Sequence, residues 1–142
     1  MKILVLNGPN LNLLDKRPVE EYGTLTLNEI ESNVRQNFPA HSFDFFQSNI
    51  EGELINKIQS ASEKFDGLII NPAGYSHTSI AIKDALDICS IRKIEVHLSN
   101  LAVRENFRHT SLTASSCDGY IAGFRENSYN AAVYLLEKIV GK

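Results

Sequence analysis

Two short, continuously apolar segments constrain the fold of this chain more than any other feature. Residues 3–6 read Ile-Leu-Val-Leu, and residues 68–70 read Leu-Ile-Ile. A strand that is apolar throughout is typical of a parallel sheet covered by helices on both faces, because neither of its faces meets water. Five strands are predicted in all, at Lys2–Asn7, Ser42–Gln47, Gly67–Asn71, Lys93–Leu98 and Gly119–Gly123, and the two apolar segments belong to the first and the third.

Segments with helical periodicity alternate with these strands. Two of them begin with the pattern of a capping box, Thr26–Glu29 and Ser48–Glu51. A third helix is expected from about Ser79 to Ile91, and a fourth over Ala131–Ile139. Regular alternation within 142 residues predicts one α/β domain over residues 1–142, with a five-stranded, parallel, doubly wound sheet. The flavodoxin-like strand order is the expected one, since an eightfold barrel needs a longer chain.

The loop after the first strand is expected to serve a ligand site. In doubly wound sheets ligands bind beyond the carboxyl ends of the strands. Residues 8–26 separate the first strand from its helix, whereas such loops usually have ~2–6 residues. A loop of this length at the ligand end is typical of an active-site lid. It contains Arg17 and Tyr22, a cation and a phenol.

The fourth strand is unusual for a parallel sheet because polar side chains share one of its faces. Alternation places Glu95, His97 and Ser99 on the same side. An edge strand with one face in water would explain the pattern equally well, and the strand alone does not separate the two interpretations.

Further polar groups follow the third and fourth strands. Asn71 stands at a strand tip, and His77 follows it, although a lone histidine there is more often a surface or capping group. Arg104 and Arg108 are four residues apart and would share a face if the segment were helical; a surface helix with Glu105 as partner is the plainer alternative. Together these groups suit a small, oxygen-rich anion.

Composition excludes several classes of partner. Seventeen acidic residues against fourteen Lys and Arg give a net charge of −3, which argues against nucleic acid. No apolar run approaches the ~18 residues of a membrane span. Cys89 and Cys117 form no C-x-x-C pair and suit two buried thiols in a reducing cytoplasm. Because neither a metal-ligand cluster nor a glycine-rich phosphate loop occurs, we expect no metal and no cofactor.

Several segments, in order, resemble the type II 3-dehydroquinate dehydratases. They are 6–14 (LNGPNLNLL), Tyr22-Gly23 with Thr26-Leu27, 71–79 (NPAGYSHTS), and 95–100 (EVHLSN) with Arg104, Phe107 and Arg108. The resemblance implies a flavodoxin-like fold and a cytoplasmic homododecamer built as a tetramer of trimers. It also implies a cofactor-free lyase of the shikimate pathway, which supplies aromatic amino acids. Its reaction converts 3-dehydroquinate to 3-dehydroshikimate through an enolate.

The resemblance also implies catalytic roles. Tyr22 matches the base that takes the C2 proton, and Arg17 matches the cation that favours its phenolate. Asn12 matches the residue that holds a water on the enolate oxygen. His97 matches the acid that protonates the departing C1 hydroxyl, with Glu95 in support.

Other positions correspond to substrate contacts of the family. Arg104 matches a second arginine near the base, and Asp84 matches an acid that reaches the site of a neighbouring subunit. The lid departs from the family at Asp15 and at Pro18-Val19, where members often carry Gly and Glu-Pro. The remaining substrate-contact positions are Asn71, His77, Leu98, Ser99 and Arg108.

Three other interpretations of the function are weaker. A flavin-binding electron carrier would need a Ser/Thr- and Gly-rich loop after the first strand. A phosphoacceptor signalling domain would need acids where Asn7 and Asn71 stand. A non-catalytic flavodoxin-like binding module is the main alternative, although the intact set of Tyr22, Arg17 and His97 argues against it.

Overall fold

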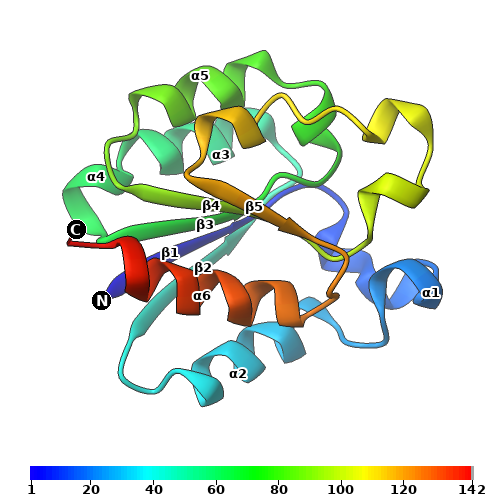
Figure 1. Cartoon of the computed structure of the whole chain (residues 1–142), viewed down its shortest axis with the longest axis horizontal. Helices are drawn as coiled ribbons and strands as arrows, with labels where there is room; N and C mark the ends of the chain where they lie inside the picture. Colours follow the sequence, from blue (N-terminus) through cyan, green and yellow to red (C-terminus); the bar gives the residue numbers. More distant parts are fainter. Residues whose placement is uncertain (142) are drawn as a thin grey trace.

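The computed structural model describes residues 1–141 and contains one all-parallel sheet (Figure 1). The strands lie in the order β2-β1-β3-β4-β5, which is the flavodoxin-like order and confirms the predicted fold class. All five predicted strands are present, although the last two differ from the prediction by one residue at their ends. Their bounds are β1 (Lys2–Asn7), β2 (Ser42–Gln47), β3 (Gly67–Asn71), β4 (Arg92–His97) and β5 (Gly119–Ala122).

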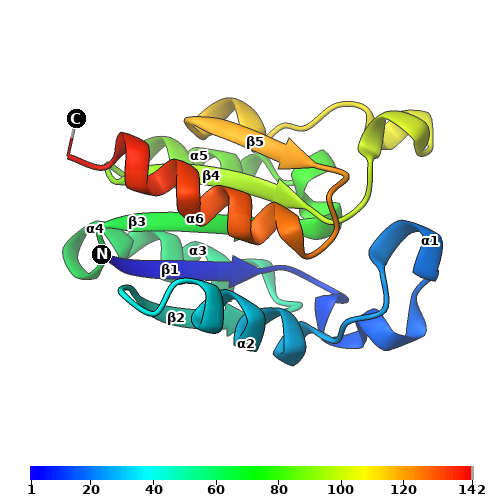
Figure 2. The same ribbon diagram turned by 60° about the horizontal axis from the view of Figure 1, so that its bottom comes forward.

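Helices cover both faces of the sheet. One face carries α2 (Leu27–Asn37) and α6 (Asn127–Ile139), and the other carries α3 (Glu51–Gln59) and α5 (Ile80–Ile88), as Figure 2 shows. Two single-turn helices, α1 (Val19–Tyr22) and α4 (Ala61–Lys64), complete the set. Within the part of the chain that is described, no helix is long and apolar enough to cross a membrane.

The core consists of two apolar layers, one on each face of the sheet. Along β1, Ile3 and Val5 join the layer beneath α2 and α6, whereas Leu4 and Leu6 join the layer beneath α3 and α5. All four side chains have no exposed surface. The continuous apolar run in the sequence therefore reflects a strand buried on both faces, as predicted.

The first predicted capping box is confirmed at the start of α2. Thr26 Oγ1 accepts from the Glu29 backbone N–H at 3.2 Å, and the Glu29 carboxylate accepts from the Thr26 backbone N–H at 2.7 Å. The pair satisfies two of the donors that a helix leaves open at its N-terminus.

The second predicted box is wrong. Ser48 Oγ accepts from the backbone N–H of Ile50 at 2.9 Å, and α3 starts only at Glu51. The Ser48 backbone N–H is bonded to the Asn7 carbonyl at 3.0 Å, which continues the β1–β2 pairing past Gln47. Because this pairing holds Ser48 at the end of the strand, Ser48 cannot also cap the start of α3.

Helix α5 is shorter than the predicted 79–91. Ser79 caps it by accepting from the Ile82 backbone N–H at 2.9 Å, and it ends at Ile88. Cys89 follows in extended conformation and is buried, as expected. Cys117 was also expected to be buried, but it is only half-buried. Both thiols are free.

Candidate active site

A narrow pocket opens at the carboxyl ends of β3 and β4. Figure 2 shows α1 and the turns around residues 101–108 at this end of the sheet, beyond the arrowheads. The pocket combines polar groups from the lid, the strand ends and the segment after β4. Its lining residues are Leu11, Arg17, Tyr22, Asn71, Ala73, Gly74, His77, His97, Leu98, Ser99, Leu101, Arg104 and Arg108.

The phenol of Tyr22 lies between two guanidinium groups. Arg17 Nη2 donates to the Tyr22 hydroxyl oxygen, and Arg104 Nη1 donates to the same oxygen at 3.0 Å. The Arg17 guanidinium carbon also lies 3.9 Å from the centre of the Tyr22 ring. Two cationic donors therefore meet at one phenol oxygen, and such charge-assisted hydrogen bonds are stronger than those between neutral groups.

The lid brings Tyr22 back onto Arg17 through a single helical turn. The Tyr22 backbone N–H bonds to the Pro18 carbonyl at 3.0 Å, and Gly23 ends the turn at φ 79°. Leu11 and Leu14 anchor the preceding segment in the core, each with 2% of its surface exposed. Pro18 is the N-cap of this turn, and its carbonyl accepts the hydrogen bond that closes it.

His97 is held by a buried carboxylate. Its Nε2 lies 2.6 Å from Glu95 Oε1, and Glu95 has no exposed surface. Ser111 Oγ donates to Glu95 Oε1 at 3.0 Å, and Thr113 Oγ1 donates to Oε2 at 2.6 Å. Since a carboxylate accepts from Nε2–H, the Nδ1 atom of His97 is left to hold or release a proton towards a ligand.

Strand β4 lies between β3 and β5, so the interpretation of β4 as an edge strand is wrong.

His77 and Asn71 also line the pocket. The rings of His77 and His97 are stacked, with centroids 6.3 Å apart. His77 Nδ1 donates to the Thr110 carbonyl at 2.8 Å, which leaves Nε2 for a ligand. Asn71 is buried at the tip of β3.

Arg104 and Arg108 do not share a helix. Two separate 3₁₀ turns, Leu101–Val103 and Asn106–Arg108, replace it, and Arg104 between them is extended. This lets Arg104 turn inward to Tyr22 and to Ser99 Oγ at 2.9 Å. Arg108 pairs with exposed Glu105 at 2.8 Å, but not on the surface helix that the plainer alternative expected, and it also lines the pocket.

Three arginines give the pocket a strong positive charge. Burial lowers the pKa of Arg17 from its ordinary value, Tyr22 opposes that shift, and the charges of Arg108 and Arg104 lower the pKa further. Repulsion among these half-buried cations decreases when an anion enters, so the pocket suits a small anionic ligand. Within residues 1–141, no three His, Cys, Asp or Glu side chains come together as metal ligands.

Three of the candidate residues do not line the pocket: Glu95, which is buried behind His97, and the exposed Asn12 and Asp84. Asn12 is exposed, and its amide oxygen lies 3.5 Å from Gln47 Nε2. Asp84 is exposed on α5. Ser99 and Leu98 do line the pocket, at the carboxyl end of β4.

Sequence reasoning missed the residues that support the site. Ser111 and Thr113 hold Glu95, and Tyr129 of α6 donates to Asn7 and accepts from Asn71. These residues carry no local pattern, because a hydroxyl near a carboxylate distant in sequence leaves no periodicity to detect. Only the unusual polar face of β4 indicated that buried partners had to exist.

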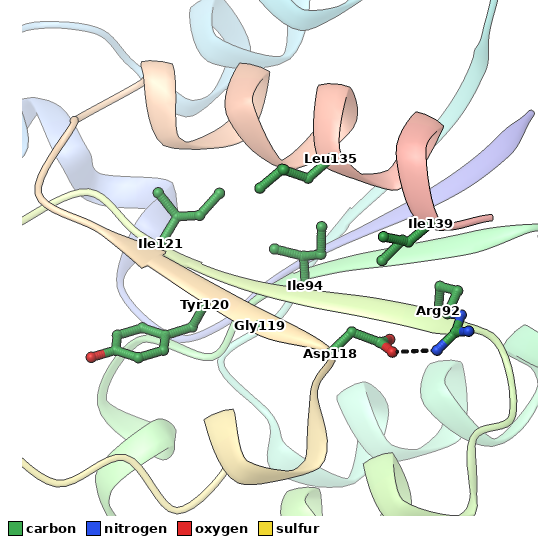
Figure 3. Close-up of a pocket in the computed structure, with 8 residues that line it drawn as sticks. All are labelled: Arg92, Ile94, Asp118, Gly119, Tyr120, Ile121, Leu135 and Ile139. Carbon is green, nitrogen blue, oxygen red and sulfur yellow. Dashed lines mark hydrogen bonds and ion pairs between the residues drawn. The ribbon is translucent and has the colours of Figure 1, made fainter. Parts of the chain in front are cut away.

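A larger groove lies elsewhere, along the edge strand β5 (Figure 3). Its volume is about 370 Å³, and its apolar lining includes Ile94, Ile121, Leu135 and Ile139. Its two charged side chains, Arg92 and Asp118, neutralise each other in an ion pair at 2.7 Å. The groove therefore offers apolar surface and little chemistry, so the catalytic candidates remain in the smaller pocket.

Comparison with known proteins identifies the family of this chain. A family model described as dehydroquinase class II matches residues 1–137. The chain belongs to the class II dehydroquinases. A 3-dehydroquinate dehydratase of Clostridium perfringens is 50% identical over 141 residues, which cover 97% of each chain. The enzyme of the same name from Wolinella succinogenes is 44% identical, covering all of this chain and 87% of the relative.

Solved class II dehydroquinases have the same architecture. The type II dehydroquinase of Butyrivibrio crossotus superposes with a TM-score of 0.93 at 43% identity, covering 96% of this chain and 97% of the other. The type II dehydroquinase of Propionibacterium acnes gives 0.90 at 37% identity, covering 96% of each. The dehydroquinase fold is therefore retained along nearly the whole chain.

Proposed function

We propose that this chain is a 3-dehydroquinate dehydratase, a lyase that converts 3-dehydroquinate to 3-dehydroshikimate in the shikimate pathway. The observation that carries the proposal is the Tyr22 hydroxyl oxygen, which accepts from both Arg17 and Arg104. A phenol held in this way suits the role of a base, because two cationic donors already point at the oxygen that takes the proton. Membership of the class II dehydroquinases names the substrate class.

The reaction begins at the lid. Tyr22 removes the proton at C2, and the electrons of that bond form an enolate whose negative charge lies on the C3 oxygen. Arg17 and Arg104 remain protonated, so they stabilise the phenolate and do not compete for the proton. Asn12 holds a water on the enolate oxygen. Because Asn12 lies outside the pocket beside Gln47, it reaches that oxygen better through a bridging water than by direct contact.

The second step takes place at β4. The enolate electrons return to form the C1–C2 double bond, and the C1–O bond breaks. His97 gives its Nδ1 proton to the departing hydroxyl, which leaves as water. Glu95 stabilises the positive charge that the ring carries before this transfer, through the contact of 2.6 Å. Base and acid are both side chains, so the proposal includes no cofactor and no metal.

Binding of the substrate uses the rest of the pocket. The carboxylate and hydroxyl oxygens of 3-dehydroquinate meet Asn71, His77, Ser99 and Arg108, and Leu98 shapes the wall at the end of β4. The surplus of positive charge in the pocket offsets the mildly acidic character of the whole chain.

We further propose a homododecamer in the cytoplasm. The apolar groove beside edge strand β5 supplies a surface that a second copy can cover. Asp84 on α5 is exposed and outside its own pocket, which suits a residue that reaches a neighbouring site. Two free cysteines fit a reducing compartment. Sedimentation velocity tests the assembly: a monomer at micromolar concentration would contradict it.

Activity is tested with purified protein and 3-dehydroquinate, without added metal or cofactor. Absorbance of the conjugated enone product in the ultraviolet should rise, and the rise should resist chelator and borohydride. Borohydride traps a Schiff base, which an enolate route does not form. Absence of any rise from folded protein would favour the non-catalytic binding module instead.

A further inference from the structure

A buried chain of hydrogen bonds joins α6 to the tips of two strands. Tyr129, with 1% of its surface exposed, donates from its hydroxyl to Asn7 Oδ1 at 2.5 Å. The same hydroxyl oxygen accepts from Asn71 Nδ2 at 3.0 Å. Asn7 and Asn71 are register partners at the carboxyl ends of β1 and β3, and both are buried. Tyr129 does not line the pocket, whereas Asn71 does.

The neighbours of Asn71 fix the orientation of its amide, whereas Asn7 Nδ2 is buried and finds no hydrogen-bond partner among residues 1–141. Asn71 Oδ1 accepts from the Ala73 backbone N–H at 3.1 Å, so the amide oxygen faces Ala73 and the nitrogen faces Tyr129. Burial raises the pKa of Tyr129, so its hydroxyl stays protonated and donates to Asn7. An inverted Asn71 amide would set N–H against N–H at Ala73, and a buried mismatch of this kind is costly.

The backbone beside Asn71 is itself unusual. Ala73 has φ 53°, in the left-handed region that favours glycine, and it also lines the pocket. The hydrogen bond from its N–H to Asn71 Oδ1 supports this conformation. One hydrogen of Asn71 Nδ2 is used by Tyr129, and the second is available to a ligand in the pocket.

We propose that Tyr129 is a positioning residue, which orients the Asn71 amide so that an N–H donor faces the substrate. This inference rests on the proposed dehydratase function, in which Asn71 contacts 3-dehydroquinate. Tyr129 acts only through Asn71, because its own hydroxyl is buried beneath the strand tips. The consequence is selection for a substrate oxygen at that position, since an amide held in this way offers a donor and no acceptor.

The test replaces Tyr129 by Phe, which removes the hydroxyl and preserves the packing of the ring. We expect KM for 3-dehydroquinate to rise about tenfold, with kcat changed by less than about threefold, because one oriented hydrogen bond to substrate is weakened. Tyr134→Phe is the matched control, since Tyr134 lies exposed on the same helix. An unchanged KM in Tyr129→Phe would overturn the proposal.

A double-mutant cycle separates positioning from a general loss of structure. In an Asn71→Ala background, Tyr129→Phe should leave KM unaltered, because the amide that it orients is absent. If Tyr129→Phe raised KM by the same factor in both backgrounds, it would act independently of Asn71, and the proposal would fail. A lower melting temperature with normal KM would likewise identify a purely structural hydroxyl.

Failure of the proposed function gives a different result. A wild-type protein that folds and does not turn over 3-dehydroquinate contradicts the function, whatever the variants do. The orientation of Asn71 is then judged from the crystal structure of Tyr129→Phe. There the Asn71 side chain should occupy more than one rotamer; a single conformer unchanged from wild type would overturn the positioning role.

Discussion

Arg104 Nη1 lies 3.0 Å from the hydroxyl oxygen of Tyr22, although 82 positions separate the two residues in the chain. Arg104 approaches from the segment after β4, and Tyr22 approaches from the lid after β1. The same guanidinium contacts Ser99 at 2.9 Å and Glu21 of the lid at 3.2 Å. Arg104 therefore joins the lid to the sheet, and its positive charge lies beside the proposed base.

Arg104→Lys should reduce kcat/KM by about a hundredfold. A lysine ammonium is a point charge and cannot hold Tyr22, Ser99 and Glu21 in the planar geometry of a guanidinium. Steady-state kinetics measure the loss. Arg125→Lys is a suitable control, because Arg125 is exposed and reaches only a lid carbonyl at 3.4 Å. Equal losses in both variants would contradict a specific role for Arg104.

Tyr22→Phe should lower kcat by at least about a thousandfold while the fold persists. The ring keeps its packing, but the oxygen that accepts from Arg17 and Arg104 is gone, and with it the base. Turnover is measured beside a circular dichroism melt. Near-normal kcat in a folded variant would show that another group removes the C2 proton.

Thr113→Val should reduce kcat about tenfold with a smaller effect on KM. Thr113 is fully buried and donates to Glu95 Oε2 at 2.6 Å, so its loss leaves the carboxylate free to turn away from His97. Ser115→Ala, two residues along, removes an exposed hydroxyl bonded only to a backbone carbonyl and should be neutral. A Thr113→Val variant with normal kcat would mean that Ser111 alone suffices.

Gly8→Ala should destabilise the protein by about 1–3 kcal/mol, the usual cost of overpacking. A Cβ on Gly8 would collide with the backbone of Pro72, which immediately follows Asn71. Gly52→Ala on α3 is the control, because a Cβ there meets nothing within 4 Å and alanine favours helix. Urea unfolding of both variants gives the comparison, and equal stability would contradict the close approach at Gly8.

Cys117 should resist thiol reagents at pH 8 in the folded protein. Burial raises its pKa from 9.0 to about 12, and the charge of Glu95 adds to the shift. Because the reactive thiolate appears only as pH approaches that value, labelling should stay slow at pH 8 and accelerate steeply above pH 10. The rate is measured with a chromogenic disulfide, with the Cys117→Ser variant as the baseline that assigns the signal.

The sequence by itself determined the architecture. Apolar runs at Ile3–Leu6 and Leu68–Ile70 predicted buried parallel strands, and the Thr26 capping box placed α2, because such patterns follow from local periodicity and local hydrogen bonds. The polar face of β4 also pointed to the site. The resemblance named the candidate residues before any contact was known.

Tertiary structure decided how those residues meet. It placed Tyr22 between two arginines, rejected a shared helix for Arg104 and Arg108, and left Asn12 outside the pocket. It also revealed Thr113 and Tyr129 as buried partners of the site. Contacts of this kind join residues far apart in the chain, and their geometry depends on how strands and loops pack, which no local pattern encodes.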